Sequence, residues 1–354
     1  MMAERDGESG LEKQSNLRLS WEPVTLDLKT TFRIAHGASD QRHNVIVRLG
    51  EGTGEAAAVA YHGETQKGIM EYLEGVAHSR FSDPFLIEDI LNQLPPGSQA
   101  ARAGVDIALH DLWGQRVGQP LYRLFGLNPE RIPPTSFTIA IDEPALMAER
   151  ARQSDSPIIK IKLGSPDDEA ILSAVRSASQ ARLRVDANAG WSREQAISLI
   201  PRLAQYDLEL VEQPLPVGDI EGLRALRQAL HAGHVTIPIF ADESIKTSKD
   251  VIAHAGAVDG VVIKLMKSGG IRAAIRAITT ARALGMQVMI GCMIETSVGV
   301  TAAAHIAPLC DYADLDGPLL IRNDPYEGVG YEGSRLIMPD RVGVGVVKKK
   351  RTHS

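Results

Sequence analysis

The chain has 354 residues, of which 44% are hydrophobic and 23% are charged, and its formal net charge is −6 at pH 7. This length exceeds one typical core, so we expect two structural units in an ordinary globular protein. The acidic balance argues against binding to nucleic acid, and the lack of an apolar run of about 18 residues argues against a membrane span. The two cysteines, Cys292 and Cys310, cannot form a disulfide framework, so we expect a cytoplasmic protein.

The first half of the chain predicts a small α+β unit. Residues 1–16 are polar, without the apolar segment of a signal peptide, and predict a disordered tail. Strand patterns follow between residues 17 and 60, and apolar residues recur at helical spacing over Ala100–Trp113. We therefore expect a capping domain over residues 17–130.

A repeating pattern of short β-rich runs and helical stretches follows from about residue 131 to residue 325. There are eight such runs: Ser136–Ile141, Ile158–Leu163, Leu183–Asn188, Leu208–Gln213, Ile237–Asp242, Gly260–Leu265, Gln287–Gly291 and Tyr312–Asp316. Alternating β and α elements imply a parallel sheet, and eight units predict a closed α/β barrel of the (β/α)₈ type. We expect residues 326–354 to return to the capping domain.

Charged residues stand at the ends of most of these runs. They are Lys162, Asp186, Glu212, Asp242, Lys267, Glu295 and Asp316, and they are separated by 21 to 30 residues, about one βα unit each. The carboxyl ends of the strands meet at one rim of such a barrel, and that rim carries the chemistry. The spacing therefore predicts one shared site.

Three of these residues, Asp186, Glu212 and Asp242, follow successive strands. Three converging carboxylates raise one another's pKa unless a positive charge compensates them. A hard divalent cation with oxygen ligands meets that need, and two or three carboxylates suit Mg²⁺. We expect one Mg²⁺ per subunit here, the alternative being salt bridges to lysines of the rim.

Lys160 and Lys162 lie two residues apart on one strand, so both side chains point into the barrel. Each disfavours the charged form of the other and a metal ion adds to this, so we expect at least one lysine pKa to fall. Lys267 follows a strand on the opposite side. Two opposed amines, with a metal to stabilise negative charge on a substrate carboxylate, predict a 1,1-proton transfer that inverts the α-carbon.

Five motifs in this order resemble the enolase superfamily, specifically its muconate lactonising subgroup. They are Lys160-Ile-Lys162, Val185-Asp186-Ala-Asn188, Val211-Glu212-Gln-Pro214, Ala241-Asp242-Glu243-Ser244 and Ile263-Lys264-Leu-Met-Lys267. The resemblance runs from about residue 17 to residue 345. It implies that Asp186, Glu212 and Asp242 hold Mg²⁺ and that Lys162 and Lys267 are the acid and base. It further implies that Lys160 assists Lys162 and that Asn188 and Glu243 support the site.

The last strand carries two more carboxylates, Asp314 and Asp316, on one face. This pair resembles the Asp-x-Asp pair of the dipeptide epimerases, a group within the family. In those enzymes the pair holds the free ammonium group of the substrate. The resemblance thus implies a dipeptide of the L-Ala-L-Xaa type as the small-molecule substrate, with epimerisation at its C-terminal residue. Family members often form oligomers, so we also expect a homo-oligomer.

Several further residues are expected around the substrate. Glu295 is expected to accept a hydrogen bond or orient the substrate, and His36, His62 and Met293 are candidates for the side-chain pocket. The Ala-Glu epimerases carry an arginine in the first cap loop where this chain has Gly37, so strict glutamate specificity is not expected.

Two alternatives remain open from the sequence. One is a cycloisomerase or lyase of the same subgroup, such as a muconate lactonising or o-succinylbenzoate-forming enzyme, which would need no ammonium site. The other is a small-molecule binding protein without catalysis, for which a proton donor on each face of the ligand would have no use.

Overall fold

The structure is a computed structural model that describes residues 17–79, 81 and 83–350. The predicted disordered tail, residues 1–16, lies outside the described residues. No helix in the described part of the chain is long and apolar enough to cross a membrane.

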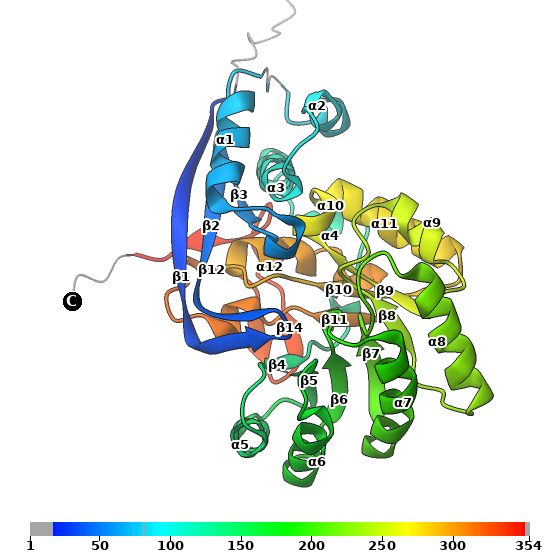
Figure 1. Ribbon diagram of the computed structural model, residues 1–354. Coiled ribbons are helices and arrows are strands. Elements are labelled where there is room, and N and C mark those ends of the chain that lie inside the picture. Colours follow the sequence, from blue (N-terminus) through cyan, green and yellow to red (C-terminus); the bar gives the residue numbers. More distant parts are fainter. Residues whose placement is uncertain (1–16, 80, 82, 351–354) are drawn as a thin grey trace, which may run out of the picture.

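The N-terminal unit is a three-stranded antiparallel sheet with helices packed on one face (Figure 1). Its elements are β1 (Leu19–Ile34), β2 (Gly37–Leu49), β3 (Gly52–Ala57), α1 (Gln66–Val76), α2 (Ile87–Gln93), α3 (Gln99–Val117) and α4 (Leu121–Leu124). Strand β3 and helix α3 approach so closely that a Cβ atom at Gly54 would lie 2.1 Å from the carbonyl oxygen of Gly104. Glycine is therefore required at position 54 for this contact.

Eight parallel strands form the second unit. They are β4 (Phe137–Ile139), β5 (Ile158–Lys162), β6 (Arg182–Asp186), β7 (Leu208–Glu212), β8 (Ile239–Ala241), β9 (Gly260–Lys264), β10 (Gln287–Gly291) and β11 (Tyr312–Asp314). Each strand pairs with the next in the sequence, and a parallel bridge between Thr135 and Ala313 brings the two ends of the sheet together. The predicted (β/α)₈ barrel with an N-terminal cap is therefore confirmed.

Helices on the outside of the sheet bury the outer faces of the strands (Figure 1). They are α5 (Pro144–Gln153), α6 (Asp168–Ala178), α7 (Arg193–Leu203), α8 (Ile220–Ala232), α9 (Ser248–His254), α11 (Ile271–Ala283) and α12 (Ser297–Ala304), whereas the short α10 (Leu265–Ser268) continues β9 at the rim and packs against α3 of the cap. Strands such as β5 and β9 are buried at every residue because helices cover one face and the barrel interior the other. Charged side chains within these strands must therefore find partners inside the barrel.

The cap is joined to the barrel through buried polar contacts. Glu55 of β3 accepts hydrogen bonds from the backbone N–H groups of Thr296 and Gly299, at the start of α12. The chain then returns to the cap after the barrel, where Arg48 of β2 donates to the hydroxyl of Tyr326 at 2.7 Å. The last strands are β12 (Tyr326–Glu327), β13 (Gly330–Glu332), β14 (Arg335–Ile337) and β15 (Val347–Lys348).

Candidate active site at the mouth of the barrel

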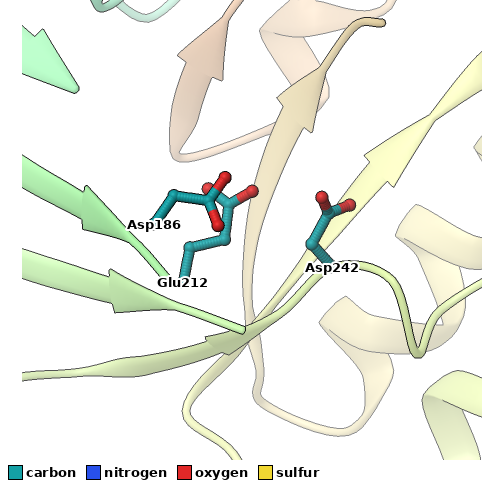
Figure 2. A group of neighbouring side chains, drawn as sticks. All are labelled: Asp186, Glu212 and Asp242. Atoms are coloured by element: carbon teal, nitrogen blue, oxygen red, sulfur yellow. The ribbon is translucent and has the colours of Figure 1, made fainter. Parts of the chain in front are cut away.

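Three carboxylates converge at the carboxyl ends of neighbouring strands. Asp186 ends β6, Glu212 ends β7, and Asp242 directly follows β8. All three side chains are fully buried, and one oxygen from each lies within 4.8 Å of the others. Figure 2 shows the three groups turned toward a common point. The strand register therefore brings together the predicted trio.

The environment of Glu212 fits a bound cation. Neither of its oxygens accepts a hydrogen bond of good geometry from the described residues, although one lies 2.8 Å from Lys160 Nζ. Burial, followed by the charge of Asp186, raises the pKa of Glu212 well above its ordinary value. A buried carboxylate without sufficient compensation is costly. Asp186, Glu212 and Asp242 supply the oxygen donors that Mg²⁺ prefers, so they could hold such an ion.

Lys160 and Lys162 of β5 both point into this cluster. Lys162 Nζ donates to Asp186 at 2.6 Å, and Lys160 Nζ donates to Asp314 at 2.7 Å. Burial lowers the pKa of Lys160, but Asp314, Glu212 and Asp186 outweigh it and hold this pKa well above its ordinary value. The expected fall in a lysine pKa is thus not found at Lys160, because the carboxylates outnumber the amines around it.

The lysine across the barrel from Lys162 is Lys264, which belongs to the fifth predicted motif but was assigned no role there. Lys264 is the last residue of β9, four strands from β5 in the closed order of eight, and it lines the same cavity as Lys162. Its Nζ donates to Asp242 at 2.8 Å. Two amines on opposite strands therefore face one cavity.

Lys267 does not lie where the sequence analysis expected it. Its side chain is fully buried on the short helix α10, and its amine donates to both the carboxylate and the backbone carbonyl of Asp242 and, at 3.1 Å, to the carbonyl of Val262. Residue 267 is three positions past the end of β9, so the helical turn carries its side chain beneath the rim instead of across it. Lys267 can thus hold Asp242 in position but does not line the cavity.

The carboxylates of Asp314 and Asp316 lie at the end of β11 and differ in their partners. Asp314 accepts from Lys160 and, at 2.6 Å, from the hydroxyl of Ser136, whereas Asp316 accepts from the backbone N–H of Thr138 at 2.7 Å. Burial and the charge of Asp314 raise the pKa of Asp316 to about 6. Both residues line the cavity, and Asp316, unlike Asp314, forms no ion pair with a lysine of the described residues.

The cavity between the cap and the barrel has a volume of about 600 Å³, within the usual range for small-molecule sites. His36 from the β1–β2 hairpin and Met293, which follows β10, both line it as expected. His62 does not: its ring packs edge-on against Tyr61, which lines the cavity, and its Nε2 contacts the carbonyl oxygen of Glu243 at 3.2 Å.

Glu295 lies beneath the cavity wall. It is fully buried and accepts from the backbone N–H of Met293 at 2.7 Å. Burial and the neighbouring carboxylate of Glu55 raise the pKa of Glu295 well above its ordinary value. This environment suits a group that fixes the loop after β10.

Asn188 and Glu243 support the carboxylate cluster from its rim. The Asn188 amide donates to Asp186 at 3.2 Å and to Glu243 at 3.0 Å. Asn188 has a φ of 43°, in the left-handed region that asparagine tolerates better than most residues. This turn directs the amide back onto the strand end.

The cavity wall also contains Arg42 of β2, which the sequence analysis did not consider. A signal for Lys264 was present, since it ends the apolar run of β9 just as Lys162 ends that of β5. No comparable local pattern distinguishes Arg42 from the other arginines of the cap.

A capped (β/α)₈ barrel with three carboxylates and opposed lysines at its mouth defines an enzyme of the enolase type. The chain matches the family described as "Mandelate racemase / muconate lactonizing enzyme, N-terminal domain" over residues 21–126 and "Enolase C-terminal domain-like" over residues 144–351. The chain belongs to this family, as its motifs predicted.

Proteins of similar sequence and structure carry epimerase names. The chain is 39% identical to the L-Ala-D/L-Glu epimerase of Bacteroides thetaiotaomicron, covering 94% of this chain and 88% of that protein. It is 37% identical to the hydrophobic dipeptide epimerase of Roseobacter litoralis, and the match covers 94% of this chain and 99% of that protein. The crystal structure of a dipeptide epimerase from Enterococcus faecalis, complexed with Mg and L-Leu-L-Tyr, superposes on this chain with a TM-score of 0.88 at 34% sequence identity. The superposition covers 94% of this chain and 99% of that one.

Proposed function

We propose that this protein is a Mg²⁺-dependent dipeptide epimerase that inverts the α-carbon of the C-terminal residue. The observation that carries the proposal is the placement of Lys162 and Lys264 on opposite strands of one cavity, with the carboxylate trio between them on β6, β7 and β8. The Enterococcus faecalis relative, complexed with Mg and a dipeptide, supports it.

The ring of strands gives the substrate one orientation. The carboxylate trio occupies one arc of the barrel mouth, while Asp314 and Asp316 lie at the end of β11, across the cavity from β7. A dipeptide placed with its carboxylate toward the trio would direct its ammonium group toward Asp316. Its C-terminal α-carbon would then lie between Lys162 and Lys264.

In this arrangement each of the two amines transfers a proton on one face of the α-carbon. When bound, Mg²⁺ stabilises negative charge on the substrate carboxylate and makes the α-proton more acidic. Lys162 Nζ takes or gives that proton on one face, and Lys264 Nζ does so on the other. Lys267 is not the second base in this proposal, because its amine is buried against Asp242 and Val262.

The decisive experiment is proton exchange in D₂O. A panel of L-Ala-L-Xaa dipeptides is incubated with the protein and Mg²⁺, and the α-proton of the C-terminal residue is followed by NMR. The proposal predicts loss of that signal together with appearance of the epimer. A panel in which no dipeptide exchanges would refute it.

The substitution Asp316→Asn separates this function from a cycloisomerase or lyase of the same family. A substrate without an amino group does not need the charge at position 316, so a lyase would be nearly indifferent to the change. Two further expectations stay predictions: a cytoplasmic location and assembly into a homo-oligomer.

A further inference from the structure

Arg42 differs from the lysines of the cavity wall in its partners. Lys160, Lys162 and Lys264 each have a carboxylate oxygen within 2.8 Å. The Arg42 guanidinium forms no ion pair among residues 17–79, 81 and 83–350, and within these residues it donates a hydrogen bond to the carbonyl of Gln41 at 3.0 Å. A guanidinium has five N–H donors, so most of its capacity is left for a ligand.

The side chain of Arg42 points toward the barrel, not toward solvent. Side chains two residues apart on a strand share a face, and Asn44 of the same strand donates to Glu55 and to the carbonyl of Ile294. Arg42 lies on that face, half-buried, with its guanidinium 5.8 Å from the centre of the Phe32 ring. Arg42 and Phe32 both line the cavity described above.

The surroundings make an unpaired cation here costly. Burial lowers the pKa of the Arg42 guanidinium, because this wall offers the charge less solvation than water does. Phe32, Ile294 and Leu320 supply apolar surface to the same wall. An arginine loses solvation as it is buried, and an anionic partner compensates that loss best. Since the described chain offers none, the partner is expected to come from the ligand.

We propose that Arg42 selects dipeptides that carry an acidic side chain, an inference that rests on the proposed epimerase function. The planar guanidinium binds a carboxylate through two parallel hydrogen bonds, a geometry that a neutral amide side chain cannot match. The second anionic group of the substrate is thus recognised by the cap, while its main-chain carboxylate would be bound through the Mg²⁺ held by the carboxylate trio. The acidic side chain can belong to either residue of the dipeptide.

The test compares each acidic dipeptide with its amide counterpart on the same protein. One arm uses L-Ala-L-Glu against L-Ala-L-Gln, and the other uses L-Asp-L-Ala against L-Asn-L-Ala, so the arms show which residue carries the recognised group. In one arm kcat/KM for the acid should exceed that for the amide by about tenfold or more, the usual effect of a charged hydrogen bond. In Arg42→Gln this ratio should fall to about one, whereas Arg42→Lys should keep part of it.

The matched control is Arg33→Gln, on the same hairpin. Arg33 is exposed and lines a different hollow, with Asp142 and Asp167, so its loss should leave the acid-to-amide ratio at the wild-type value. Because the ratio is measured within each variant, partial loss of folded protein cancels. A wild-type ratio near one in both arms, or a preference that survives Arg42→Gln, would overturn the inference while leaving the epimerase standing. Failure of every dipeptide to react would overturn both.

Discussion

Lys160, on the floor of the cavity, has three carboxylates within 3.2 Å, whereas Arg42, in the wall supplied by the cap, has none among the described residues. The floor consists of the charged side chains at the carboxyl ends of the barrel strands. These side chains are buried, and the lysines among them form ion pairs with neighbouring carboxylates. The wall is built from a hairpin whose tip, including His36, is exposed. A buried floor with densely interacting charges suits chemistry that is the same for every substrate, and an exposed wall with few polar contacts suits recognition that differs between substrates. We therefore expect the floor to carry out the reaction and the wall to select the substrate.

The largest effect is expected from removing the metal. Chelation with EDTA, or the substitution Glu212→Gln, should abolish turnover because the metal stabilises the second negative charge that develops on the substrate carboxylate. Mg²⁺ should also raise the melting temperature of the wild type, since saturation to about 100 times Kd contributes roughly 2.7 kcal/mol. Full activity after exhaustive chelation would show that the floor works without a metal.

The next largest effect is expected at the two opposed amines. Lys162→Ala and Lys264→Ala should each lower kcat by roughly 10²- to 10⁴-fold, the usual contribution of a positioned acid or base. Both variants should keep the Mg²⁺-dependent rise in melting temperature, because the carboxylate trio is intact.

Lys267→Met is the matched control for the amines. This substitution leaves a buried carboxylate with one lysine fewer, so we expect a loss of stability of about 3 kcal/mol or more. Because Lys267 positions Asp242 without lining the cavity, kcat of the folded fraction should fall less than in Lys264→Ala. The opposite pattern, an active Lys264→Ala protein and a folded but inactive Lys267→Met protein, would restore Lys267 as the second base.

A smaller loss of activity is expected from substituting Asp316, the floor residue that would bind the substrate ammonium group. Asp316→Asn should lower kcat/KM for dipeptides by about 10²-fold, because a buried charge-to-charge hydrogen bond becomes a neutral one. The matched control is an N-acyl amino acid that lacks the ammonium group. An equal loss of activity with both substrates would mean that the substitution acts on the structure of the site.

The same residue predicts a pH dependence. Burial and Asp314 raise the pKa of Asp316 to about 6, and the protonated form cannot pair with an ammonium group. The kcat/KM for dipeptides should therefore be constant above this pKa and fall as the pH drops below it. This acid limb should vanish in Asp316→Asn, so a limb that persists in the variant would belong to another group.

The smallest effect is expected in the wall. His36 is exposed at the tip of the hairpin, and contacts at a solvated rim contribute less than about 1 kcal/mol. His36→Ala should accordingly change kcat/KM by less than about fivefold for any dipeptide. A change as large as that of Lys162→Ala would erase the distinction between wall and floor.

The sequence predicted the floor well because the constraint is periodic. A residue at the end of each barrel strand returns to one rim about every 25 residues, so the positions of Asp186, Glu212 and Asp242 followed from strand spacing alone. Spacing could not decide between Lys264 and Lys267, since β9 passes directly into α10 and only the point of transition determines which amine faces the cavity.

The wall was less predictable because it depends on pairing between distant segments. The register of β1 with β2, including an irregularity between Asp27 and Phe32, brings Phe32 and Arg42 to the same cavity. His62 and Glu295 carry residue types that suit a site, yet tertiary packing turns His62 onto Glu243 and buries Glu295 beside Glu55. Local sequence patterns contain no signal for such long-range contacts.

The most direct test of the central claim is the stereochemistry of proton exchange in the two lysine variants. Each variant is incubated in D₂O with Mg²⁺ and with either epimer of a reactive dipeptide, and NMR follows deuterium at the α-carbon. If Lys162 and Lys264 act on opposite faces, each variant should exchange the α-proton of one epimer, without inverting it, and the two variants should choose opposite epimers. Exchange of both epimers by a single variant, or the same choice by both variants, would contradict the account.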